Sequence, residues 1–120
     1  MKLVIAIVQD EDASRLVNKL MGEGFGATKL ATTGGFLRSG NTTLLTGVED
    51  DKVPMVMEII EKTCKSRKQM APVHAPMTGS AGMYVPAYPV QVTVGGAIVF
   101  VLDVEQFHKF LVKQGDAAQI

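Results

Sequence analysis

Hydrophobic and polar positions along the chain follow periods typical of both strands and helices. Leu3–Val8 is an almost unbroken apolar, β-branched run, which predicts a strand buried on both faces. Apolar side chains then recur at intervals of three and four, which predicts an amphipathic helix. The recurring residues are Ala13, Leu16, Val17, Leu20 and Met21. We expect Asp10 to cap this helix and Gly22 to end it.

Two further strands and a second helix are predicted in the middle of the chain. Ala27–Thr33 and Thr42–Val48 are expected to be strands joined by a short glycine-rich segment at residues 34–40. Asp51 is expected to cap a helix that has Pro54 in its first turn. The apolar stripe of this helix consists of Val53, Val56, Met57, Ile60 and Cys64. The basic cluster Lys62, Lys65, Arg67 and Lys68 is expected to be its solvated C-terminal end.

The C-terminal half begins with a segment rich in helix and strand breakers. Residues 69–89 contain Pro72, Pro76, Pro86 and Pro89, and they predict a long irregular loop. Val90–Val94 and Ala97–Val104 predict strands, and the Gly95-Gly96 pair between them is a hairpin signal. Glu105–Val112 is expected to form a short closing helix.

The predicted order of elements defines a fold class. The chain is expected to be one α+β domain, residues 1–120, with a ferredoxin-like βαββαβ sandwich and an extra C-terminal hairpin strand. In such a sandwich two helices cover one face of an antiparallel sheet. A chain of 120 residues has no third layer for the other face. We therefore expect the protein to oligomerise through that face.

Composition narrows the classes of function. Lys plus Arg and Asp plus Glu both number 12, so the chain lacks the basic excess that binding of long nucleic acid requires. Cys64 is the only cysteine, which fits a reducing compartment and excludes an internal disulfide. The apolar run Leu3–Val8 is too short for a signal peptide or a membrane span. We expect a cytoplasmic protein with no membrane insertion.

One stretch, Thr28–Thr43, combines residue types that bind nucleotides. It holds five threonines, three glycines, Asn41 and two cations around one loop. Glycines allow backbone N–H groups to face an anion, and hydroxyls add further donors. Phe36 at the loop tip can stack on a nucleobase, and Asn41 can pair with an adenine edge. Equally, Phe36 and Leu37 can pack against the protein core or an oligomer interface without any ligand.

Other motifs of catalysis are missing from the sequence. The loop is neither a P-loop nor a dinucleotide-binding G-x-G-x-x-G motif. Glu105 and His108 have a spacing that can bind metal, but a surface pair on a short helix explains them as well. No nucleophile, acid and base are arranged as a catalytic set. We expect a protein that is not an enzyme and that uses neither a cofactor nor a metal.

The chain resembles the PII-like cyclic di-AMP receptor family of Gram-positive bacteria. The resemblance rests on the motif ATKLATTGGFLRSGNTT at residues 27–43, on IAIVQD at residues 5–10 and on VGGAIVFVLDVEQFHKF at residues 94–110. It implies a ferredoxin-like homotrimer that holds one cyclic di-AMP at each intersubunit cleft. It also implies that the ligand orders the 69–89 loop and thereby alters the binding site of a protein target.

The resemblance also assigns roles to individual residues. Thr28 would bond a phosphate, and Asn41 would read a base edge. Gly35, Phe36 and Leu37 would line the base pocket, with Phe36 stacked on adenine. Gly47 would let the ligand approach the backbone, and Gln106 would contact the other adenine. Thr28, Phe36 and Asn41 are also nominated by their chemistry alone, whereas Gly47 and Gln106 follow only from the resemblance.

One position departs from the family pattern and leaves alternatives open. The family commonly has an Arg before the Ala-Thr-Lys of the motif, and Gly26 occupies that position here. The resemblance then implies that a charge-assisted phosphate contact of about 1.5–3 kcal/mol is missing, unless Lys29 or Arg38 compensates for it or the ligand differs. One alternative is a PII-type sensor of ATP or ADP, which is disfavoured by the short 34–40 loop and by the scarcity of basic residues for a triphosphate. The other is a trimeric interaction module that binds no ligand, or a metal-tolerance protein of the same fold.

Overall fold

The computed structural model describes residues 1–32, 40–73 and 88–111 of the chain. The predicted site residues Gly35, Phe36 and Leu37 lie outside these ranges, as does most of the expected 69–89 loop. The helices are α1 (Asp10–Gly22) and α2 (Val53–Cys64), with a 3₁₀ turn at Asp50–Lys52 before α2. The strands are β1 (Lys2–Gln9), β2 (Thr28–Thr32), β3 (Asn41–Val48), β4 (Arg67–Val73), β5 (Tyr88–Val94) and β6 (Ala97–Asp103).

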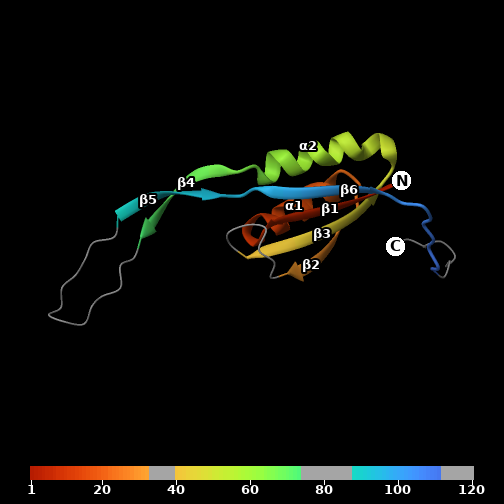
Figure 1. Ribbon diagram of the computed structural model, residues 1–120, viewed down its shortest axis with the longest axis horizontal. Coiled ribbons are helices and arrows are strands. Elements are labelled where there is room, and N and C mark those ends of the chain that lie inside the picture. Colours follow the sequence, from red (N-terminus) through yellow and green to blue (C-terminus); the bar gives the residue numbers. More distant parts are fainter. Residues whose placement is uncertain (33–39, 74–87, 112–120) are drawn as a thin grey trace.

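The main sheet has the ferredoxin-like strand order β2-β3-β1-β6 (Figure 1). All three pairings are antiparallel, and β1 lies between β3 and β6. The predicted α+β sandwich is therefore confirmed. Alternate residues of β1 point to opposite faces of the sheet. Val4, Ala6 and Val8 are buried on one face, whereas Leu3 and Ile5 on the other face are partly exposed, so the predicted burial on both faces is wrong for these two residues.

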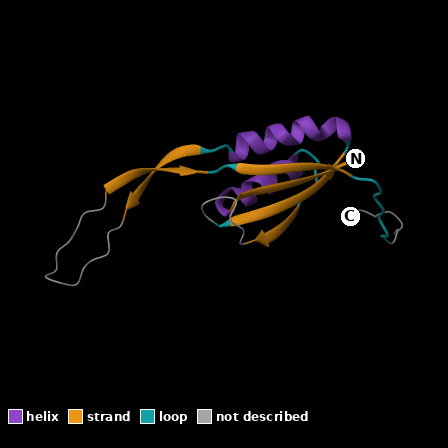
Figure 2. Ribbon diagram, in the orientation of Figure 1, coloured by secondary structure: helices purple, strands orange, loops and turns teal. Residues whose placement is uncertain are grey.

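Both helices pack on the same face of this sheet (Figure 2). The core contains Val4, Ala6 and Val8 of β1, which are at most 2% exposed. Leu16 and Leu20 of α1 and Val56, Ile60 and Cys64 of α2 pack against them. These helix residues are the apolar positions that the period of 3.6 residues predicts. Cys64 is a core residue, as expected, and burial raises the pKa of its thiol to about 11.

Strands β4 and β5 form a separate two-stranded ribbon that projects from one end of the sandwich (Figure 1). The expectation of an irregular loop from residue 69 onwards is thus wrong for residues 69–73 and 88–89. Pro72 and Pro89 face each other in the ribbon register. Facing residues in an antiparallel pair alternate between bonded and non-bonded positions, and proline has no N–H to donate. The pairing of β4 with β5 nevertheless continues through both prolines to Val73 and Tyr88.

The Gly95-Gly96 pair joins two sheets and does not form the predicted hairpin, because β5 pairs with β4 while β6 pairs with β1. Both glycines have positive φ angles, 85° and 103°. A Cβ at residue 95 would lie 2.7 Å from the carbonyl oxygen of Lys65 and 3.0 Å from that of Cys64. Glycine is therefore required where the chain crosses from the ribbon into the sandwich.

Three local predictions are wrong. Asp10 and Asp51 do not cap their helices: the capping positions are Gln9 and Lys52, and neither makes a side-chain capping bond. The helix expected over Glu105–Val112 is not formed in its described part, which has no regular structure. Phe107 and Phe110 in this segment are 56% and 90% exposed, so a short helix has no surface to pack on.

Candidate functional site

The sheet face opposite the two helices is apolar and uncovered by any described element. Residues alternate between faces along a strand, and paired residues of neighbouring strands share a face. This face, called the open face below, is formed by Leu3, Ile5, Ile7, Leu30, Leu45, Ile98, Phe100 and Leu102. Leu30, Phe100 and Leu102 are 44%, 46% and 44% exposed. Such a contiguous apolar surface marks an interaction site.

Thr28 and Gly47, two of the predicted ligand residues, lie on the open face. Thr28 is exposed at the start of β2 and faces Leu45 in the register. Gly47 is exposed near the end of β3 and faces Leu3. Among the described atoms, a Cβ at residue 47 would meet only the Met1 Sδ, at 3.8 Å, which is an ordinary contact. Packing within the described chain therefore does not require glycine at this position.

Asn41, the third predicted ligand residue within the described ranges, is buried at the start of β3. It is 1% exposed, faces Gln9 of β1 in the register, and already has an interaction partner in the chain. Asp10 forms hydrogen bonds with both residues that flank Asn41. The Thr42 hydroxyl donates a hydrogen bond to Asp10 Oδ1 at 2.5 Å, and the Asp10 backbone N–H donates to the Gly40 carbonyl at 3.0 Å.

Gln106 follows β6 at the opposite end of the sheet. Its side chain is exposed, and its Oε1 lies 3.0 Å from His108 Nε2. Asn41 and Gly47 mark the two ends of β3, about 20 Å apart at about 3.4 Å per residue. The structure therefore brings Gly47 and Gln106 to one end of the sheet and places Asn41 at the other end.

Sequence reasoning missed the polar contacts at the base of the ribbon. Asp12 is fully buried and accepts hydrogen bonds from Arg67, at 3.0 Å, and from Arg15, at 2.9 Å. The hydrogen bond to Asp12 raises the pKa of the Arg67 guanidinium. The prediction that Arg67 belongs to a solvated helix end is thus wrong, because it begins β4 and pairs with a buried acid. The pair could not be predicted because its two residues are far apart in the sequence.

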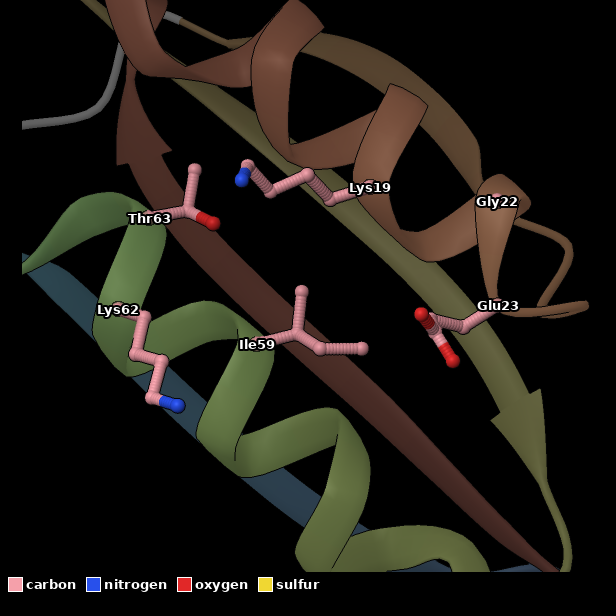
Figure 3. A pocket seen from close by; sticks show the side chains of 6 residues that line it. All are labelled: Lys19, Gly22, Glu23, Ile59, Lys62 and Thr63. Atoms are coloured by element: carbon pink, nitrogen blue, oxygen red, sulfur yellow. The ribbon is translucent and has the colours of Figure 1, made fainter.

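A groove of about 340 Å³ lies between the two helices, on the side of the molecule away from the open face (Figure 3). It is lined by Lys19, Gly22, Glu23, Ile59, Lys62 and Thr63. Lys62 pairs with Glu58 at 2.8 Å, and the Thr63 hydroxyl is buried without a partner among the described residues. None of the predicted ligand residues is among those that line this groove.

Over residues 1–32, 40–73 and 88–111, no helix is long and apolar enough to cross a membrane. Within that part of the chain, no three or more His, Cys, Asp or Glu side chains are grouped so that they could hold a metal ion.

The sheet order, the helix layer and the apolar open face define a ferredoxin-like α+β protein. A family model described as cyclic-di-AMP receptor matches residues 1–110, and the chain belongs to this family. A similar solved structure is that of a functionally unknown protein from Pediococcus pentosaceus. The two chains are 49% identical, the match covers 91% of this chain and 96% of the other, and the TM-score is 0.72.

Proposed function

We propose that this protein binds cyclic di-AMP at clefts between the subunits of a homotrimer and acts as a cytoplasmic signalling receptor. It has no catalytic role and needs no cofactor. The ligand contacts are those of Thr28, Gly35, Phe36, Leu37, Asn41, Gly47 and Gln106. Ligand binding changes the segment between β4 and β5, and this change is read by a protein target. Membership of the cyclic-di-AMP receptor family supports the choice of ligand.

The open face is the observation that carries the proposal. Its exposed apolar residues need a cover, and further apolar surface lies beyond β6 at Phe107, Phe110 and Leu111. Association of like subunits through this face would remove that surface from water, at about 25 cal/mol per Å². Thr28 and Gly47 would then lie at the boundary of the subunit interface.

The distribution of the ligand residues also favours a shared site. Asn41 and Gly47 are about 20 Å apart on one strand, at about 3.4 Å per residue. A compact dinucleotide meets both ends of the sheet only if two subunits each contribute one end. Glycine at residue 47 fits this arrangement, because the described chain leaves space there for a molecule to approach the backbone.

Titration calorimetry with cyclic di-AMP tests the proposal, with cyclic di-GMP and ATP as controls. We expect saturable binding of one cyclic di-AMP per subunit, and a trimer by light scattering of the same sample. Selective binding of ATP would favour the alternative of a PII-type mononucleotide sensor. A trimer that binds none of the three nucleotides at millimolar concentration would refute the proposal and favour an interaction module without ligand.

The variant Gly26→Arg sharpens the test, because it restores the basic residue that the family pattern has at this position. Residue 26 is exposed, and no described atom lies within 4 Å of a Cβ built there, so arginine fits. A charge-assisted contact of about 1.5–3 kcal/mol would tighten binding of cyclic di-AMP roughly ten- to a hundredfold.

The control for Gly26→Arg is Gly22→Arg, which adds the same charge at an exposed residue of α1 on the helix side of the sheet. We expect it to change affinity less than threefold. Equal gains in both variants would mean that the added charge acts through general attraction of the anion and not through a phosphate contact near residue 26.

A further inference from the structure

The segment Gln9–Asp12, at the turn from β1 into α1, contacts two separate parts of the molecule. On one side is the start of β3, which carries Asn41. On the other side is the base of the ribbon, where β4 begins at Arg67 and β5 ends before Gly95. These two parts are far apart in sequence, and Figure 1 shows them on either side of the same end of the sandwich.

Toward β3, the contacts fix the backbone around Asn41. Asp10 Oδ1 accepts a hydrogen bond from the Thr42 hydroxyl at 2.5 Å, and the Asp10 backbone N–H donates one to the Gly40 carbonyl at 3.0 Å. A Cβ at residue 40 would lie 2.5 Å from Asp10 Oδ2, so the backbone there is in close contact with the carboxylate. Asn41 itself faces Gln9 in the register.

Toward the ribbon, the same segment supplies buried acceptors. The Gly95 N–H donates to Gln9 Oε1 at 2.6 Å, and both residues are buried. Three residues along, Asp12 accepts from Arg67 at 3.0 Å. A two-stranded ribbon is only marginally stable alone in water, so its orientation depends on the few contacts at its base. Opening the hydrogen bond between Gly95 and Gln9 would leave the buried Gly95 N–H without an acceptor. Ribbon orientations in which this bond is only partly broken are therefore disfavoured.

We propose that Gln9 and Asp10 are positioning residues that couple Asn41 to the base of the β4–β5 ribbon. The two states are a ribbon with the Gly95 N–H bonded to Gln9 and a ribbon with that bond open. A molecule that displaces Asn41 moves Gln9 and Asp10, and it thereby shifts the balance between these states. Where that molecule is cyclic di-AMP, the inference rests on the proposed function. The coupling itself is a property of the chain and is reciprocal.

Two matched variants of β3 test the coupling without ligand. Thr42→Val and Thr46→Val make the same substitution at buried positions of one strand. Thr42 donates to Asp10, whereas Thr46 donates to the Gly26 carbonyl, away from the ribbon. Amide hydrogen exchange is read at Gly95 and Gly96. We expect Thr42→Val to speed exchange there about tenfold and Thr46→Val to change it less than twofold, with both proteins folded.

The reverse perturbation uses Gln9. Gln9→Met removes the acceptor for the Gly95 N–H at similar size, and Gln9→Glu keeps an acceptor oxygen. Gln9→Met should speed exchange at Asn41 and Thr42 about tenfold, and Gln9→Glu should change it less than threefold. Faster exchange at Gly95 alone, or equal effects of Thr42→Val and Thr46→Val at the ribbon base, would overturn the coupling.

A ligand arm separates this inference from the proposed function. Cyclic di-AMP at saturating concentration should alter exchange at Gly95 and Gly96 in the wild-type protein, and Thr42→Val should lose most of that alteration while still binding. If the wild type does not bind cyclic di-AMP, the proposed function fails, and the ligand-free comparison still decides the coupling. If it binds and the ribbon base is unchanged, the function stands and the coupling is refuted.

Discussion

The sandwich and the β4–β5 ribbon are stabilised in different ways. The sandwich has a core in which strand and helix residues such as Val4, Leu16 and Val56 are fully buried. The ribbon has one face with Val90, Val92 and Val94, all of them at least partly exposed. Its attachment to the sandwich is polar, through Arg67 and Gly95. The sandwich is thus a folded body in its own right, whereas the ribbon is ordered by a small number of specific contacts.

The largest expected effect is the loss in free energy of unfolding for a substitution in the core, compared with one in the ribbon. Leu44→Ala, at a position 1% exposed in β3, should lower the free energy of unfolding by about 2–5 kcal/mol. Val92→Ala in the ribbon should lower it by less than about 0.5 kcal/mol, because that side chain already contacts water. Urea unfolding measures both values. Similar losses in the two variants would show that the ribbon folds as part of the core.

A smaller effect is expected at the attachment of the ribbon. Asp12→Ala leaves Arg67 and Arg15 without their buried acceptor and should cost about 2 kcal/mol, since both arginines keep partial contact with water. Exchange of the β4 and β5 amides should rise at the same time. The exposed Asp51→Ala is the control and should leave ribbon exchange unchanged. Equal exchange in both variants would contradict the role of Asp12 as the anchor of the ribbon.

A pH-dependent effect is expected at Cys64, which lies where the core meets the ribbon base. Its carbonyl accepts the Gly96 N–H at 2.5 Å, and burial raises the pKa of its thiol to about 11. A raised folded pKa means that the neutral thiol contributes its full stability below about pH 8.5, the pKa of a free cysteine, and that this contribution is lost as the pH rises toward 11.

The difference between wild type and Cys64→Ala isolates this titration from that of lysines and tyrosines. Between pH 8.5 and 10.5 the wild type should lose up to about 1.4 kcal/mol per pH unit more than the variant. Unfolding in urea at a series of pH values gives the two slopes. Parallel slopes would mean that the thiol is accessible to water and that the joint between core and ribbon is open in solution.

Local periodicity was enough to predict the sandwich. The run Leu3–Val8 and the helical stripes of α1 and α2 depend on a packed core, and a core imposes its period on the sequence. The ribbon has no core and imposes no such period. Its strands include Pro72 and Pro89, which look like breakers until their facing register is known. The predicted helix at 105–112 is not formed in its described part for the converse reason, since its apolar residues Phe107 and Phe110 are largely exposed and do not belong to the core.

The candidate site was predictable only as far as it is local. Thr28 and Gly47 lie on the open face, but this placement depends on strand register, which could not be predicted from the sequence. Asp10 was expected to cap α1, but its carboxylate accepts a hydrogen bond from Thr42 of β3. The Asp12–Arg67 pair joins residues from α1 and β4. Contacts between residues so distant in sequence produce no periodic pattern or motif in the sequence. These contacts therefore could not be predicted.

The ribbon also acts geometrically as a lever whose pivot is the Gly95 and Arg67 joint. Seven residues of β4, from Arg67 to Val73, extend from that joint. At about 3.4 Å per residue the arm is about 20 Å long, so a tilt of about 10° at the pivot moves its far end by about 3.5 Å. If Gln9 is coupled to this joint as proposed, a small tilt at the joint would become a displacement of a few ångströms at the far end of β4.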